Sequence, residues 1–172
     1  VPLIELATRL GYRVWMAPLK PNGKPLHVQG FLKTFNRVAR RNSEHLSGLA
    51  RTGIALVGLD PAMTLVYRQE YLKVPGLTQV PEVLLPQEWL ARVWPRAGKT
   101  ETAPQTVTYR LLPHCTERTN APASVGQWQE VFAKAGLSLQ VEASGCCGMS
   151  GTYGHEARNY ETSRVIFEQS WK

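Results

Sequence analysis

The sequence is poor in cysteine, with three among 172 residues, and it has no long apolar run. Three thiols cannot all pair, which argues against a disulfide framework and favours a reducing, cytoplasmic compartment. No apolar stretch reaches the roughly 18 residues that a membrane-spanning helix needs. The first residues lack the basic and apolar regions of a signal peptide. We therefore expect a cytoplasmic protein with no membrane span.

Acidic residues are outnumbered by basic ones, and the net charge is +7. The excess lies in residues 1–86, where eleven Lys and Arg accompany five Asp and Glu, and it is densest over residues 33–41. Such clusters occur in nucleic-acid-binding proteins and also on solvated helix faces. No aromatic-interleaved basic motif accompanies this one. We therefore interpret it as a helix face, expect no nucleic-acid partner, and keep nucleic-acid binding as the weaker alternative.

What the sequence does have is an alternation of strand and helix patterns. Short apolar runs predict strands over residues 12–19, 54–60, 106–113 and 137–144. Amphipathic spacing predicts helices over residues 3–11, 30–53, 61–72, 86–94, 123–136 and 155–171. Strands that alternate with helices are typical of an α/β fold with a mainly parallel sheet.

The two ends of the chain resemble each other. Residues 5–23 align without a gap on residues 130–148, and both copies read as helix, glycine, strand and glycine turn. Gly23 falls on Gly148 in this alignment. We therefore predict two pseudo-repeated, Rossmann-like halves with mainly parallel strands and flanking helices. The predicted divisions are a first half over residues 1–86, a helix and linker over 87–105, and a second half over 106–172.

The cysteines lie where predicted strands end. Cys115 follows the strand over residues 106–113, and Cys146 and Cys147 follow the strand over 137–144. Ligands gather outside the carboxyl ends of strands in open α/β sheets, so neighbouring strands would bring the three sulfurs together. Convergent thiolates suit zinc or an iron–sulfur cluster. The order of the chain therefore predicts a thiolate site at one end of a sheet.

Other interpretations of the thiols stay open. Cys115 alone could be a small buried apolar residue, and the cysteine pair could form a disulfide or act as a reactive thiol without metal. Zinc and clusters usually take four ligands, so His114 or His155 could complete the set. Gly148 and Gly151 are predicted to let the backbone approach a bound cofactor closely. The sequence identifies no catalytic residue.

Two motifs resemble a known family. The stretch "LPHC" (residues 112–115) and the later "SGCCGMSGTYG" (144–154) resemble the cysteine-rich CCG domain. That domain occurs in heterodisulfide reductase, in the iron–sulfur subunit of glycolate oxidase, and at the C-terminus of bacterial FAD-linked oxidases. The stretches "PNGKPLHVQG", "GLDPAMTLVYRQEY", "VLLPQEWL" and "SGTYGHEARNYETS" are similar to single-chain FAD and iron–sulfur oxidoreductases of the D-2-hydroxyglutarate dehydrogenase type.

The resemblance implies an iron–sulfur, cysteine-rich electron-transfer domain of a FAD-dependent 2-hydroxyacid dehydrogenase. It implies that Cys115, Cys146 and Cys147 are metal ligands. FAD would lie on a domain of the same polypeptide that this chain does not contain, and that domain would be its partner. The alternative is a structural zinc-binding or metal-free docking domain of the same enzyme, without a redox role.

The chain departs from the family pattern in both halves. Asn22 and Gly23 stand where the family has Cys-Cys-Gly, and residues 60–63 ("DPAM") stand where it often has Pro-Ser-Cys, so we expect no cluster in the first half. The repeat places the last ligand element of the second half beyond Lys172. We therefore expect a fragment that folds, is inactive alone, and retains no iron–sulfur cluster.

Overall fold

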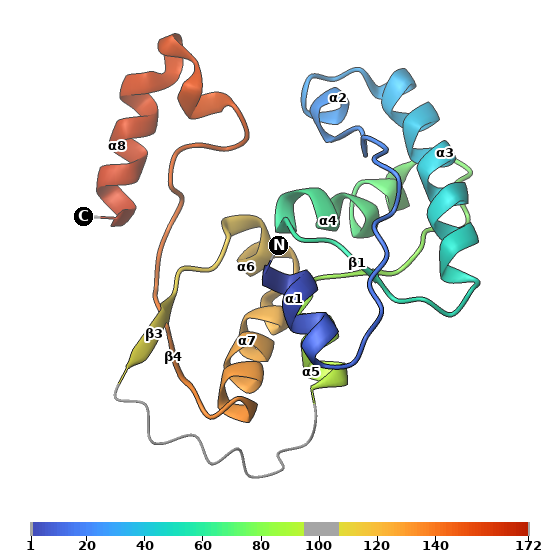
Figure 1. The fold of residues 1–172 in the computed structure, drawn as a ribbon. Coiled ribbons are helices and arrows are strands. Elements are labelled where there is room, and N and C mark those ends of the chain that lie inside the picture. The colour runs from blue at the N-terminus through green and yellow to red at the C-terminus, as the bar shows by residue number, and fades with distance from the viewer. Residues whose placement is uncertain (1, 95–106, 172) are drawn as a thin grey trace.

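The computed structural model describes residues 2–94 and 107–171 (Figure 1). The first range contains α1 (Pro2–Arg9), α2 (Lys24–Val28), α3 (Leu32–Ala50), β1 (Leu56–Val57), α4 (Pro61–Arg68), the 3₁₀ turn η1 (Tyr71–Lys73), β2 (Val83–Leu84) and α5 (Pro86–Val93). The second contains β3 (Thr108–Leu111), α6 (Cys115–Asn120), α7 (Pro122–Lys134), β4 (Ser138–Val141), the 3₁₀ turns η2 (Tyr153–His155) and η3 (Ala157–Asn159), and α8 (Tyr160–Trp171). No helix in these two ranges is both long and apolar enough to cross a bilayer.

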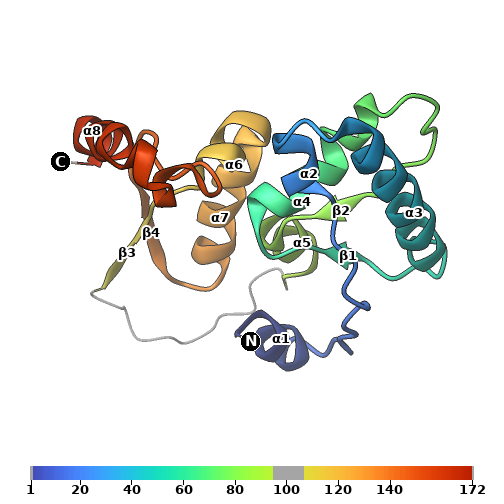
Figure 2. The same ribbon diagram turned by 90° about the horizontal axis from the view of Figure 1, so that it is seen from above.

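The strands form two small parallel sheets in separate parts of the molecule (Figure 2). Strand β1 pairs with β2, with Leu56 opposite Val83, and β3 pairs with β4, with Thr108 opposite Ser138. A mixed α/β chain with parallel strands is thus confirmed. The predicted strand over residues 54–60 is longer than β1, and two complete Rossmann-like halves are not seen in the described ranges.

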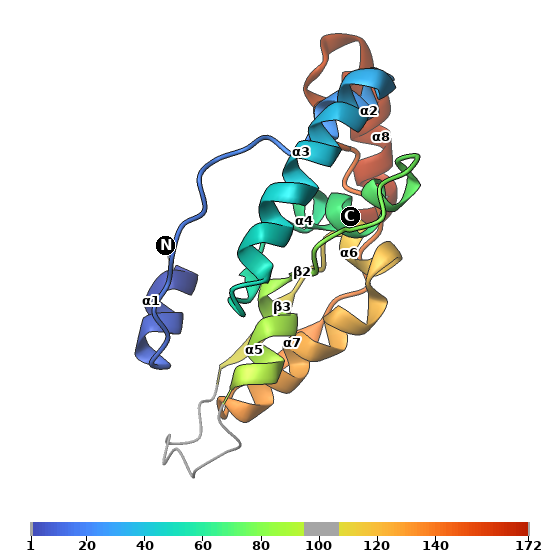
Figure 3. The same ribbon diagram turned by 90° about the vertical axis from the view of Figure 1, so that its right-hand side faces the viewer.

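The prediction of a strand over residues 12–19 is wrong for this structure. The segment runs between α1 and α2 without forming a ladder, along the outside of the molecule (Figure 3). Its apolar side chains point into solvent, and Leu19 is 96% exposed. A strand is stabilised by hydrogen bonds to a neighbouring strand, and no described segment lies beside this one to provide them.

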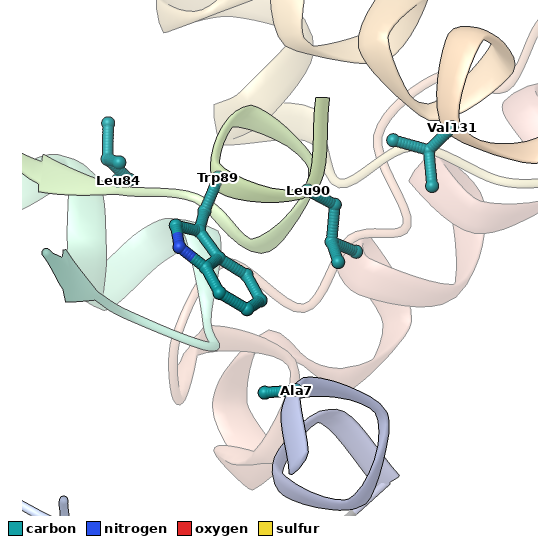
Figure 4. Packing of buried hydrophobic residues seen from close by; sticks show 5 residues of the cluster. All are labelled: Ala7, Leu84, Trp89, Leu90 and Val131. Atoms are coloured by element: carbon teal, nitrogen blue, oxygen red, sulfur yellow. The ribbon is translucent and has the colours of Figure 1, made fainter. Parts of the chain in front are cut away.

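Helix α5 lies at the centre of one hydrophobic cluster. Its residues Trp89 and Leu90 pack between Ala7 of α1 and Val131 of α7 (Figure 4). A second cluster joins α3, α4 and η1, and its buried members are Phe35, Ala39, Val66, Tyr71 and Val74. The first cluster holds α1, α5 and α7 together and the second holds α3, α4 and η1 together, and none of their members is a cysteine.

Helices α4 and α5 are capped and joined by one ion pair. The Asp60 carboxylate accepts the backbone N–H of Met63 at 2.8 Å, which begins α4. The Glu88 carboxylate accepts the N–H of Leu85 at 2.8 Å at the start of α5. Nη1 of Arg68, at the end of α4, donates to both oxygens of Glu88 at 2.8 and 2.7 Å. This contact holds α4 against α5.

Helices α1 and α7 end in the same way, in agreement with the sequence repeat. The N–H of Gly11 donates to the carbonyl of Thr8 at 3.0 Å, and that of Gly136 donates to Ala133 at 3.0 Å. Both glycines have positive φ, 86° and 72°, which glycine adopts without steric cost. Helix α2 ends with the same pattern of bonds at Gly30, so this is a general glycine-terminated helix end and the repeat stays a prediction. Of the segments after α1 and α7, only the one after α7 continues into a strand.

Candidate functional site

The cysteines lie at one end of the β3–β4 pair. Strand β3 leads through Pro113 to Cys115, which is the first residue of α6 rather than the last of a strand. The ladder continues past β4, because the N–H of Glu142 donates to the carbonyl of Leu111 at 2.9 Å. Parallel pairing therefore directs both cysteine-bearing segments out of the same edge, as the sequence predicts.

Arg118 connects these two segments. It lies one turn after Cys115 on α6, and its Nη1 donates to the carbonyl oxygen of Ser144, two residues before Cys146. Ser144 itself is buried, and its Oγ has no hydrogen-bond partner in the described structure. The contact anchors the start of the cysteine-containing turn to α6 and leaves a polar atom inside the junction.

The thiols are free and accessible. Cys115 and Cys146 are exposed and Cys147 is half-buried, and none of them forms a disulfide. The N–H of Gly148 donates to Sγ of Cys146 at 3.4 Å. No group of three His, Cys, Asp or Glu side chains within residues 2–94 and 107–171 is arranged to hold a metal ion. The structure thus shows the donors at one sheet edge, whereas their role as ligands stays a prediction.

The glycines around the thiols accommodate helix α8. A Cβ atom on Gly148 would overlap the carbonyl oxygen of Ser163, and one on Gly145 would overlap Oγ of Ser170. Ser163 also donates from Oγ to the carbonyl of Gly148 at 2.9 Å. Gly151 has open space around it. Close approach at Gly148 is therefore to a helix of this chain, and cofactor binding by Gly148 and Gly151 stays a prediction.

The two candidate histidines differ in which ring nitrogens are available to bind a metal. Nδ1 of His114 accepts the N–H of Thr116 at 3.1 Å and thereby caps α6. The other ring nitrogen, Nε2, is the one that could bind a metal. His155 lies in η2 and is exposed. Neither histidine forms part of a metal-ligand group within the described ranges, so a fourth ligand among them also stays a prediction.

In the first half, Asn22 occupies the position that corresponds to Cys147. Its Nδ2 donates to the carbonyl of Met63 at 2.9 Å and lies 3.6 Å from Sδ of the same residue. Its Oδ1 accepts the N–H of Lys24 at 3.0 Å. The Tyr71 hydroxyl donates to the carbonyl of Asn22 at 2.9 Å. Asn22 and Met63 therefore touch each other inside a hydrogen-bonded turn, and their correspondence to family cysteines stays a prediction.

A buried carboxyl group near the candidate site was not predicted. Oε1 of Glu117 accepts hydrogen bonds from Nε2 of Gln87 at 2.7 Å and from Oγ of Ser124 at 2.9 Å. Burial raises the pKa of the Glu117 carboxyl above its ordinary value, and these hydrogen bonds partly oppose that effect. Glu117 follows Cys115 by half a turn. A polar residue at the inward position of an amphipathic helix is the signal that could have found it.

Nearly the whole chain is similar to one part of longer proteins. D-2-hydroxyglutarate dehydrogenase of Pseudomonas putida is 65% identical over 98% of this chain, which spans 16% of that protein. The Escherichia coli K12 protein of the same name is 39% identical, with the same coverage. A subunit of the anaerobic glycerol-3-phosphate dehydrogenase of Escherichia coli K12 is 29% identical over 95% of the chain, which spans 42% of it.

These relatives confirm the resemblance to oxidoreductases of the D-2-hydroxyglutarate dehydrogenase type. The chain matches no protein-family model, and no solved structure matches it significantly. The chain spans only 16% of the length of the first of these relatives.

Proposed function

We propose that this chain is the cysteine-rich electron-transfer part of a FAD-dependent 2-hydroxyacid dehydrogenase, with D-2-hydroxyglutarate as the substrate class. The observation that carries the proposal is the 65% identity to a D-2-hydroxyglutarate dehydrogenase over 98% of the chain. The thiols at one edge of the β3–β4 pair support it, because an electron-transfer part needs a redox group near its surface. FAD and the hydroxyacid would bind to the rest of the polypeptide.

Cys115, Cys146 and Cys147 are the proposed ligands of an iron–sulfur cluster. Their donor chemistry fits this role, because cluster iron is held by cysteine thiolates and the three thiols are unpaired. The Gly148 N–H already donates to Sγ of Cys146, and such hydrogen bonds tune cluster sulfurs. A bound cluster would supply one-electron transfer. Nε2 of His114, or a residue outside this chain, would be the fourth ligand.

The division of the chain follows from the same proposal. Residues 1–86 form a cysteine-free half in which Asn22 and Met63 have replaced ligands, and residues 106–172 form the half that holds the thiols. The two halves are pseudo-repeats in a Rossmann-like arrangement. The gapless alignment of residues 5–23 on residues 130–148 supports this relation. We infer from it that one metal site, and not two, belongs to this part of the polypeptide.

A structural zinc site, or a metal-free docking role, is the competing function. Zinc also binds thiolates, and the absence of a preformed ligand group in the described ranges fits a docking role equally well. The metal itself separates these possibilities. The polypeptide that contains this chain should be purified without air, and its iron, acid-labile sulfide and zinc should be measured. Iron with equimolar sulfide supports the proposal, while stoichiometric zinc or no metal contradicts it.

A matched pair of variants assigns the metal to this site. Cys147→Ser removes a proposed thiolate, whereas Ala143→Ser introduces the same side chain at an exposed position in the same loop. We expect Cys147→Ser to lose most of the iron and the turnover with a one-electron acceptor, and Ala143→Ser to retain both. Unchanged iron in Cys147→Ser would show that the cluster is bound elsewhere in the polypeptide.

A further inference from the structure

We propose that residues 13–16 are a strand that pairs in parallel with a segment of the same polypeptide lying upstream of Val1. This pairing concerns the assembly of the polypeptide and does not depend on the metal. The region that contains this strand, residues 12–19, is called here the open segment. Its partner strand would convert the exposed open segment into part of a parallel sheet.

The open segment is a run of exposed apolar side chains. Trp15 is 76% exposed, Met16 is 82% exposed and Leu19 is 96% exposed, with Val14 at 43%. Single exposed apolar residues are ordinary, but a run of this kind marks a surface that is covered in the assembled protein. Apolar residues on both faces of the segment are typical of a parallel strand that is buried on both sides.

The backbone that leads into the open segment has the geometry of the backbone that leads into β4. Three hydrogen bonds at the end of α1 recur at the end of α7. Each bond at the end of α7 joins the two residues that the repeat aligns with those of a bond at the end of α1, as Gly136 aligns with Gly11. They are Leu10 to Leu6, Gly11 to Thr8 and Tyr12 to Ala7, matched by Ala135 to Val131, Gly136 to Ala133 and Leu137 to Phe132. The chain therefore leaves both helices with the same hydrogen-bonded geometry. Helix α2 ends in the same way at Gly30 and is followed by α3, so this geometry permits a following strand without requiring one.

The same shift aligns the open segment with β4 residue by residue. Arg13 falls on Ser138, the first residue of β4, and Val14 and Met16 fall on Leu139 and Val141. Leu139 and Val141 are the half-buried residues of β4, and Ser138 is exposed. Val14 and Met16 thus have the apolar side chains of an inward strand face. Within the described residues, β4 has a partner strand and the open segment has none.

The partner of β4 indicates what the missing partner is. Strand β3 begins at Thr108 and precedes β4, which begins at Ser138, and the two pair in parallel. A partner strand at the same distance before Arg13 would lie upstream of Val1. The chain spans only 16% of the length of the first relatives, so most of such a polypeptide lies outside residues 1–172. An upstream strand of the same polypeptide is therefore the occupant that the repeat specifies, in preference to a second copy of the chain or a lipid surface.

Hydrogen exchange in the longer polypeptide tests the pairing. The amides of residues 13–16 should exchange about as slowly as those of residues 138–141, at least roughly tenfold slower than an unpaired segment. The β4 amides serve as the internal reference because they are paired within this chain. Exchange of residues 13–16 at the unpaired rate would overturn the proposal. Protection that disappears on dilution, or that needs added anionic vesicles, would also overturn it by assigning the surface to a second copy or to lipid.

A pair of charge substitutions gives an independent test in the same polypeptide. Met16→Lys places a charge on the proposed sheet face, while Leu72→Lys changes a 65% exposed apolar residue outside the open segment. We expect Met16→Lys to lower the melting temperature by several degrees and to restore fast exchange at residues 13–16, and Leu72→Lys to do neither. Equal behaviour of the two variants would mean that Met16 faces solvent in the whole protein, which contradicts the proposal.

Discussion

Asn22 illustrates how a single side chain joins two chain segments that are distant in sequence. It is 8% exposed, and its side chain links the glycine turn to Met63 and to the N–H of Lys24. If residues 1–86 are the cysteine-free half that we propose, this amide links by hydrogen bonds the segments that sulfur ligands would otherwise hold. The turn at Asn22 is held by its own hydrogen bonds.

Replacing Asn22 with alanine should lower the stability of the chain. The change leaves the carbonyl of Met63 and the N–H of Lys24 without this partner in a partly buried position, which costs about 1 kcal/mol. Urea unfolding, followed by tryptophan fluorescence, measures the difference. The control is Asn120→Ala, because Asn120 is exposed at the end of α6. Equal stability of the two variants would show that the Asn22 network contributes nothing.

Tyr71 gives the same region a dependence on alkaline pH. Burial raises the pKa of Tyr71 to about 12, although the hydrogen bond from Asn42 lowers it. Because the folded pKa lies above the unfolded value of 10.0, this group stabilises the fold below pH 10. That contribution is lost as the pH rises through the folded pKa. The Tyr71 hydroxyl therefore matters most at neutral pH.

The variant Tyr71→Phe tests the direction of this pH dependence. It should be less stable than the original chain at neutral pH by about 1 kcal/mol, because the hydrogen bonds to Asn22 and Asn42 are lost. The difference in free energy of unfolding between the two chains should decrease between pH values of about 10 and 12, where the original chain loses the contribution of its neutral phenol. Urea unfolding at several pH values checks the trend, with Tyr160→Phe, at an exposed tyrosine, as the control. A difference that stays constant over this range would contradict the assignment.

At the scale of elements, helices followed from the sequence much better than strands did. Helices α1 and α7 were predicted closely, because their hydrogen bonds form between neighbours in the chain and a glycine follows each. Strand β1 and the open segment were predicted from apolar runs alone. A strand also needs a partner from elsewhere, and nothing in the local sequence reports whether that partner is present.

The candidate site was likewise predicted only in part from the sequence. The order of strand and cysteine along the chain was enough to place Cys115 and the Cys146–Cys147 pair at one edge, since β3 and β4 do pair in parallel. The Arg118 contact with Ser144, and the packing of α8 on Gly148, could not be predicted. Both join residues that are distant in sequence and leave no periodic pattern. At Gly148, the close approach that was predicted for a cofactor is made by α8.

The docking of α8 on the cysteine turn can be tested with two glycine variants. Gly148→Ala forces a side chain onto a residue with φ 78° and against the Ser163 carbonyl, whereas Gly151→Ala meets open space at φ 64°. We expect a cost of about 1 kcal/mol for Gly151→Ala and about 3 kcal/mol for Gly148→Ala, which adds the steric overlap. Faster hydrogen exchange of the α8 amides in Gly148→Ala alone is the measurement. Equal exchange in both variants would mean that α8 does not rest on this turn.

At the scale of the whole molecule, the folded core and the thiols are separate. The buried hydrophobic clusters are built from α1, α3, α4, α5 and α7 together with η1 and β2, and they include no cysteine among the described residues. The contacts between α5 and α7, and between α4 and α6, join the two halves without the turn that holds Cys146 and Cys147. Folding therefore relies on apolar burial, while the thiols stay accessible at the surface.

This separation predicts how the 172-residue chain behaves by itself. It should fold without metal, since no proposed cluster ligand belongs to the hydrophobic clusters of the described ranges. It should hold no stoichiometric iron–sulfur cluster, because it supplies three thiols where four ligands are usual, and accessible thiolates oxidise in air. Replacing all three cysteines with serine should therefore leave the melting temperature within about 2 °C of the original, which circular dichroism measures.

Iron and sulfide analysis of the same chain, purified without air, completes this prediction. Less than stoichiometric iron is expected before and after the cysteine replacement. Stoichiometric iron in the original chain would contradict the ligand count and would make Nε2 of His114 the first candidate for the fourth ligand, since Nδ1 already accepts the Thr116 N–H. A large fall in melting temperature on replacing the cysteines would instead place them in the stabilising core, against their exposure and against the composition of every hydrophobic cluster in the described ranges.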